Sequence, residues 1–93
     1  MTIKNFKHKG LRRFFQKGDK SGIQSAFSSR IGLILDLLDA AEAPKDMNFP
    51  GSDLHPLKGN LKSFYSVHVN GNWTIIFKFQ DGDACDVDLV DYH

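Results

Sequence analysis

The chain has 93 residues, of which 41% are apolar and eight are Phe, so it can form one globular domain with a modest core, and a disordered chain is excluded. No apolar run approaches the roughly 18 residues that a membrane span needs, the first residues lack a signal core, and one cysteine allows no internal disulfide. These features predict a single domain over residues 1–93 in the cytoplasm.

The net charge of +1 conceals an uneven distribution. Residues 1–30 carry eight Lys or Arg and one acid, whereas residues 31–93 carry four Lys and ten acids. Such a dipolar chain can present a basic surface to phosphates or to an acidic partner. The alternative is an ordinary solvated helix whose charges pair with the acidic half.

The first half of the chain predicts one short strand and two helices. Residues 2–6 alternate between polar and apolar side chains, which is typical of a strand. Apolar residues at i, i+3 and i+4 predict a basic helix over 8–17 that ends at Gly18. A second amphipathic helix is expected over 25–43, stopped by Pro44, and the two helices should form a hairpin on one face of a sheet.

The second half predicts an antiparallel meander, because turn residues separate stretches rich in β-branched and aromatic side chains. Strands are expected over 64–69, 73–79 and 84–92, after a short strand over 54–57. Asn-Gly at 70–71 and Asp-Gly at 81–82 favour tight hairpin turns. Strand alternation predicts that four residues face the helices: Trp73, Ile75, Phe77 and Phe79. The fold class is therefore α+β.

Candidate chemical groups lie in a turn and at the carboxyl end. His55 and Lys58 flank Pro56, and Tyr92 and His93 end the chain. Imidazole can transfer protons near neutral pH, and a lysine can neutralise a phosphate. Each residue also has a structural interpretation, since a surface His is often incidental and Tyr92 can simply cap the core.

Other sites have weaker support. The His and Cys spacings fit no metal site, so no metal or cofactor is expected. Five cations on and around the first helix are candidates for binding RNA phosphates by charge: Lys7, Lys9, Arg12, Arg13 and Lys17.

Four segments together resemble one protein family. They are residues 3–11 (IKNFKHKGL), 54–59 (LHPLKG), 69–73 (VNGNW) and 90–93 (VDYH). In this order and at this length they resemble the HigB-type toxins of bacterial toxin–antitoxin systems, within the RelE/ParE superfamily. The resemblance implies a small α+β domain with a helical hairpin on a mostly antiparallel sheet.

The resemblance also implies an activity and its partners. The family's activity is ribosome-dependent cleavage of messenger RNA in the A site, by attack of a ribose 2′-hydroxyl on the adjacent phosphate. His55 and His93 would then transfer protons, Lys58 would stabilise phosphate charge, and Tyr92 would orient the nucleotide. The implied partner is a helix-turn-helix antitoxin of the HigA type, which would also provide any contact with operator DNA; no membrane is involved.

One position departs from the family pattern. The motif after Asn-Trp usually continues with an active-site Arg, and here Thr74 follows Trp73. Threonine lacks a guanidinium, so we expect an attenuated or inactive nuclease. The alternatives are a non-catalytic co-repressor that acts with its antitoxin, and a gyrase-inhibiting toxin of the same superfamily.

Overall fold

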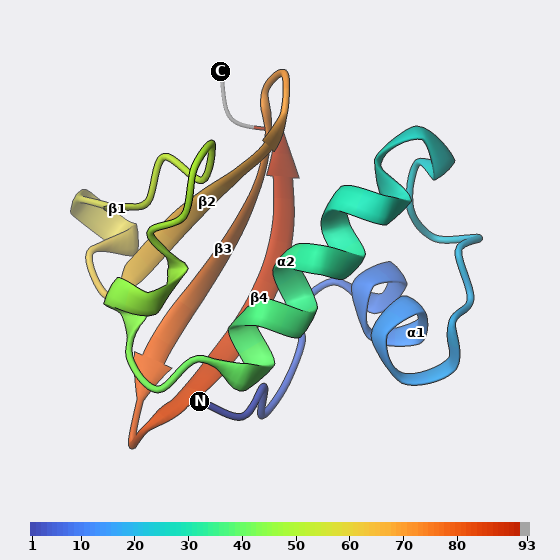
Figure 1. Ribbon diagram of the computed structural model, residues 1–93. Coiled ribbons are helices and arrows are strands. Elements are labelled where there is room, and N and C mark those ends of the chain that lie inside the picture. The colour runs from blue at the N-terminus through green and yellow to red at the C-terminus, as the bar shows by residue number, and fades with distance from the viewer. Residues whose placement is uncertain (92–93) are drawn as a thin grey trace.

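The computed structural model describes residues 1–91 and shows two helices packed on a four-stranded sheet (Figure 1). The helices are α1 (Lys9–Lys17) and α2 (Ser28–Ala40), with 3₁₀ turns at Ser25–Phe27, Pro44–Met47 and Gly59–Leu61. The strands are β1 (His55–Pro56), β2 (Phe64–Asn70), β3 (Trp73–Gln80) and β4 (Asp83–Asp91). The predicted α+β class is confirmed. Within residues 1–91, no helix is both long and apolar enough to cross a membrane.

The sheet is the expected antiparallel meander, in the order β1-β2-β3-β4. Asp81 and Gly82 connect β3 to β4, and both have left-handed backbone angles (φ 52° and 82°), as a tight primed turn requires. The β2–β3 turn lies one residue later than expected. Asn70 still pairs with Trp73, so the connecting residues are Gly71 and Asn72.

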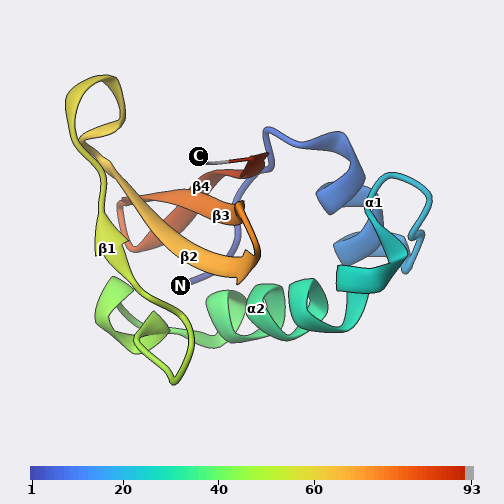
Figure 2. The ribbon, with the colours of Figure 1, turned by 90° about the horizontal axis from the view of Figure 1, so that it is seen from above.

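Helix α2 covers one face of the sheet, and α1 lies beyond the β4 edge (Figure 2). The stripe on α2 supplies four fully buried side chains, which pack with Leu11, Val67, Ile75 and Phe77 in the main core. Those four are Ile31, Ile34, Leu35 and Leu38. Trp73, Ile75 and Phe77 contact this core as predicted. The prediction for Phe79 was wrong, because this ring is 37% exposed near the end of β3.

Helix α1 matches its prediction, and α2 is shorter than its prediction. The side chain of His8 caps α1, and Gly18 ends it in the left-handed region (φ 71°). The expected helix over 25–43 is instead a 3₁₀ turn followed by α2, which ends at Ala40 because Ala41 is extended. Pro44 begins the next 3₁₀ turn and does not itself stop α2.

The amino-terminal segment is not the regular strand that we expected over residues 2–6. It runs parallel to β4 and contacts it at two isolated bridges, Ile3 with Ala84 and Phe6 with Val87. Between these bridges β4 carries an extra residue, since Ile76 pairs with Asp88 while Lys78 pairs with Cys85. This bulge interrupts the ladder, which explains why two bridges form and not a continuous strand.

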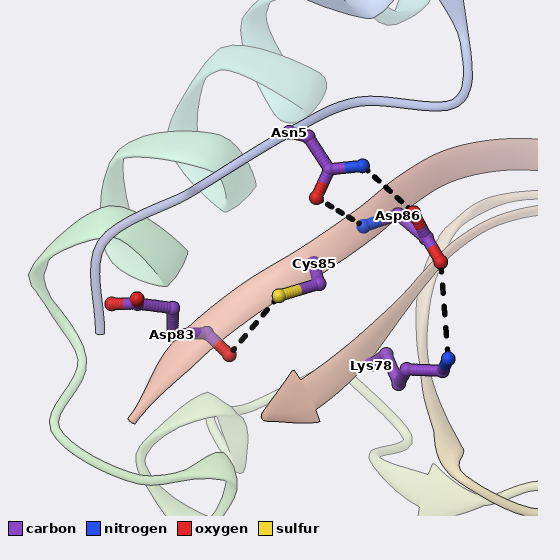
Figure 3. Close-up of polar contacts among 5 residues, drawn as sticks. All are labelled: Asn5, Lys78, Asp83, Cys85 and Asp86. Atoms are coloured by element: carbon purple, nitrogen blue, oxygen red, sulfur yellow. Dashed lines mark hydrogen bonds and ion pairs between the residues drawn. The ribbon is translucent and has the colours of Figure 1, made fainter. Parts of the chain in front are cut away.

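Asp86 lies in the bulge in the left-handed region (φ 51°), an uncommon conformation for a residue with a side chain. Asn5 holds it there (Figure 3). The Asn5 Nδ2 donates to Asp86 Oδ1 over 2.7 Å, and the Asp86 backbone N–H donates to Asn5 Oδ1 over 3.1 Å. Lys78 Nζ lies 3.9 Å from Asp86 Oδ2. These contacts satisfy the backbone N–H that the bulge removes from the ladder.

Gly10 and Gly22 bring α1 and the loop after it into direct backbone contact. A Cβ on Gly10 would lie 2.2 Å from the Gly22 carbonyl oxygen, and a Cβ on Gly22 would lie 2.6 Å from the Gly10 Cα. Backbone atoms cannot yield as a flexible side chain can, so only glycine fits at either position.

We therefore expect Gly10→Ala to lower the free energy of unfolding by about 3 kcal/mol, the upper range for overpacking a closed contact. Gly32→Ala is the matched control, since its Cβ would meet Phe14 at an ordinary 3.4 Å. The control should be neutral or stabilise α2 by about 1 kcal/mol. Urea denaturation of both variants measures the difference; equal effects would contradict the tight contact.

Candidate active site

The face of the sheet opposite α2, here called the outer face, carries the candidate residues His55 and Thr74. The register aligns His55, Ser66, Ile76 and Asp88 in one row across the four strands. The next row along the strands contains His68, Thr74 and Val90. Side chains of paired residues lie on the same face, so these two rows form one continuous surface.

A small second core supports this surface. Leu57, Phe64 and Ile76 are buried together, and Leu61 and Val90 pack against them. The Leu57 N–H donates to the Phe64 carbonyl over 2.9 Å, which ties the segment after β1 to β2. The two-residue strand β1 is thereby held at the sheet edge, and His55 has a fixed backbone.

The imidazole of His55 is exposed and has two polar neighbours. Its Nδ1 lies 2.9 Å from the Asp53 carbonyl oxygen, and its Nε2 lies 3.1 Å from the Ser66 hydroxyl. A carbonyl oxygen can only accept, so Nδ1 carries the proton in the neutral ring. The lone pair is then on Nε2, where the Ser66 hydroxyl can donate to it.

Lys58 follows His55 by three residues, so roughly 10 Å of extended backbone separates their Cα atoms. Its side chain is exposed, and within residues 1–91 it forms no ion pair. The backbone of Lys58 is extended and opens the 3₁₀ turn Gly59–Leu61. Lys58 is thus an exposed cation three residues after His55 in the chain.

Thr74 is only 8% exposed and lies between His68 and Val90 in its row. Lys78 shares its face but pairs with Phe64, four residues away along β3, a separation of roughly 13 Å. The Lys78 ammonium lies beside Asp86 and 5.8 Å from the Phe64 ring centroid. It is therefore engaged at the far end of the sheet and does not replace a cation at position 74.

His68 is a residue of the outer face that the sequence analysis did not select. Its Nε2 donates to the Gly71 carbonyl over 3.0 Å, so the ring closes the β2–β3 turn. Alternation along β2 and the pairing across the turn place it beside Thr74. Counting residues across the hairpin would have found this position. Its hydrogen bond to the Gly71 carbonyl gives it a structural role in the turn.

The basic residues of the first helix lie at the other end of the molecule. Lys7, Lys9, Arg12 and Lys17 are exposed, whereas Arg13 is half-buried with Nε 3.6 Å from Asp19 Oδ2. The Ser21 backbone N–H lowers the pKa of Asp19, and the charges of Arg13 and Lys17 lower it further. Arg13 thus forms a partly exposed ion pair with the loop after α1. Figures 1 and 2 place α1 past the β4 edge and β1 at the opposite edge.

Two predicted site residues, Tyr92 and His93, lie outside the described residues. The last described residue, Asp91, pairs with Trp73 across β4 and β3. Within residues 1–91, no group of three or more His, Cys, Asp or Glu is arranged to hold a metal ion.

Comparison with known proteins identifies the family. Residues 4–93 match the model of the RelE-like HigB toxins of type II toxin–antitoxin systems. The chain belongs to this family. The resemblance drawn from four short sequence segments is therefore confirmed.

Similar members of the family support this assignment. "Endoribonuclease HigB" of Proteus vulgaris is 42% identical over 91 residues, which cover 98% of this chain and 99% of the relative. "Toxin HigB-1" of Vibrio cholerae is 36% identical over 81 residues, 85% of each chain. An uncharacterized protein of Haemophilus influenzae is 30% identical over 82 residues, 86% of this chain and 81% of the relative.

The hydrogen bonds predict different tautomers for three histidines of this HigB-like toxin. Neutral His55 should carry its proton on Nδ1, whereas His8 and His68 should carry theirs on Nε2. His8 Nδ1 accepts from the Leu11 N–H over 3.1 Å, and His68 Nε2 donates to Gly71. Nitrogen-15 NMR above pH 8 distinguishes the two forms. An Nε2–H signal for His55 would refute its proposed orientation.

Proposed function

We propose that this chain is an endoribonuclease, the toxin of a type II toxin–antitoxin pair, and that it cleaves messenger RNA in the ribosomal A site. Family membership and the name of the Proteus vulgaris relative support cleavage of RNA. The observation that carries the proposal is the exposed His55 ring, whose Nδ1 is held by the Asp53 carbonyl, so that Nε2 would accept the proton once the ribose hydroxyl replaces Ser66 as its partner.

The proposed chemistry is an internal transfer at one phosphate. His55 Nε2 accepts the proton of a ribose 2′-hydroxyl, whose oxygen forms a bond to the adjacent phosphorus. The bond from phosphorus to the next 5′-oxygen breaks, which yields a 2′,3′-cyclic phosphate and a 5′-hydroxyl. Lys58 stabilises the charge on the non-bridging oxygens. His93 protonates the leaving oxygen, and Tyr92 orients the nucleotide, as the family likeness implies.

The proposed setting is the translating ribosome in the cytoplasm. The exposed cations Lys7, Lys9, Arg12 and Lys17 would bind ribosomal RNA phosphates by charge. Arg13 contributes less than predicted from sequence, since its guanidinium is paired with Asp19. The proposed partner is a HigA-type helix-turn-helix antitoxin, through which alone the complex would contact operator DNA.

The first test is cleavage of a translated messenger in a purified translation system. His55→Ala should lower the rate by about 10²–10⁴-fold, as for loss of a general base. Lys58→Ala should lower it by about 10²–10³-fold, and deletion of His93 should also slow it. Lys62→Ala is the matched control, because Lys62 is an equally exposed lysine of the same loop. Unchanged rates in all three site variants, with circular dichroism showing folded protein, would remove the site assignment.

The second test concerns attenuation at position 74. Thr74→Arg restores a guanidinium to the outer face, and we expect it to raise the cleavage rate about 10²–10³-fold. Growth inhibition on expression provides a second readout. If the chain as given and Thr74→Arg are equally and strongly toxic, the attenuation proposal fails.

Thr74 also favours a second candidate function. A toxin without the phosphate contact could still act as a co-repressor with its antitoxin. Intact messenger together with retained antitoxin binding would support this function. Inhibition of DNA supercoiling would instead indicate the gyrase-directed activity found in the superfamily.

A further inference from the structure

A pocket of about 310 Å³ lies on the side of the sheet away from His55. It forms where the start of α1, the loop over residues 20–24 and the ends of β3 and β4 meet. Four apolar and three polar side chains line it, together with Gly22: Ile23, Phe27, Trp73, Leu89, His8, Ser21 and Gln24. Its size is at the lower end of ligand sites, which suits one flat ring better than a larger molecule.

The apolar walls belong to the edge of the main core. Ile23, Phe27, Trp73 and Leu89 each pack against that core and remain half-buried. Two of these walls are aromatic rings, on which a flat heterocycle can stack. The pocket is therefore an apolar slot supported from below by buried side chains.

The polar groups of the pocket can read the edge of a base. The Leu11 N–H donates to His8 Nδ1, so the neutral His8 ring carries its proton on Nε2, which can donate. The exposed Gln24 amide offers one donor group and one acceptor. Proteins recognise unpaired nucleobases by stacking rings against them and by hydrogen-bonding to their edges with nearby donors and acceptors.

The wall of the pocket is preformed. Gly22 lines it, and its backbone contacts Gly10 of α1 directly. Asp19 and Arg13 tie the same loop to α1. A ligand would thus meet an ordered loop, which lowers the entropy cost of binding.

The charges beside the pocket favour an anionic chain. Lys7 and Lys9 flank His8 in the chain, Lys20 begins the loop on its side toward Phe14, and all three are exposed. A backbone entering and leaving the pocket would run past these lysines.

We propose that this pocket binds one unpaired nucleobase of an RNA strand, with the flanking phosphates on Lys7, Lys9 and Lys20. The assignment rests on the proposed RNA-directed function but not on cleavage, because His55 lies on the other face. The bound base is thus not at the scissile phosphate. It anchors the toxin on ribosomal RNA or on a distant part of the messenger.

Trp73 is the only tryptophan of the chain, so its fluorescence reports on the pocket. The probe is a single-stranded 2′-O-methyl RNA hexamer, which lacks the attacking hydroxyl and cannot be cut. It should change the Trp73 emission saturably. His8→Asn keeps a capping side chain but removes the imidazole donor, and Gln24→Leu removes the amide. Each should weaken binding about tenfold.

The lysines supply a charge test with a matched control. Lys9→Ala should weaken binding and reduce the slope of log affinity against log salt by about 0.7. Lys62→Ala, an exposed lysine near the β1 edge, should leave both unchanged. Equal losses in Lys9→Ala and Lys62→Ala would show unspecific attraction and overturn the site.

Three further outcomes decide the proposal. Unchanged Trp73 emission with RNA overturns it, and so does a response to the antitoxin alone, which would mean that a protein side chain fills the pocket. A response to RNA, with no messenger cleavage by either this chain or its Thr74→Arg variant, upholds the pocket and rejects the nuclease. Sedimentation with vacant ribosomes separates the two sources, because His8→Asn weakens that binding only if the base is ribosomal.

Discussion

The bulge at Asp86 determines which side chains of β4 face the core. Ala84 is inward before the bulge, and Val87 and Leu89 are inward after it. Without the extra residue, alternation would turn Asp86 and Asp88 into the main core and expose Val87. Asn5 makes the left-handed residue tolerable by pairing with both its carboxylate and its N–H. The hydrophobic core and the outer face thus both depend on one side-chain amide from the amino-terminal segment.

This arrangement also protects the β4 edge. The Lys4 and Lys7 N–H groups donate to Ala84 and Val87, so the segment occupies backbone groups that an open edge strand would leave unpaired. At the opposite edge, β1 is only two residues long and contains Pro56, which limits pairing with another chain. The amino-terminal segment consequently covers the β4 edge of the sheet, and the opposite edge is a strand of only two residues. The outer face lies between these two edges.

Sequence predicted the features that local chemistry determines. Leu11, Phe14 and Phe15 indicated α1, and Asp81-Gly82 indicated its hairpin turn, since each depends on near neighbours. The irregular pairing of residues 2–6 depends on Asp86, which is 81 positions from Asn5 along the chain. No local pattern carries that information. The same holds for the exposure of Phe79 and for the pocket beside His8, whose walls come from four separate segments. Of the predicted site, His55 and Lys58 were proposed from their turn motif and the family resemblance, whereas the contacts of the His55 ring required the structure.

In the described structure, most of the basic side chains and the candidate catalytic side chains lie at different ends of the molecule. Five of the cations of residues 1–30 lie on or beside α1, beyond one edge of the sheet, and His55 lies in β1 at the other edge. Thr74 occupies the middle of the outer face, where it is almost buried, and contributes no charge of its own. Affinity for RNA would then come mainly from the α1 end, while the rate would depend on a few groups around His55. In the proposed mechanism, a cation at position 74 would contact charge that develops only during cleavage. A change there would then alter the rate more than the affinity for RNA.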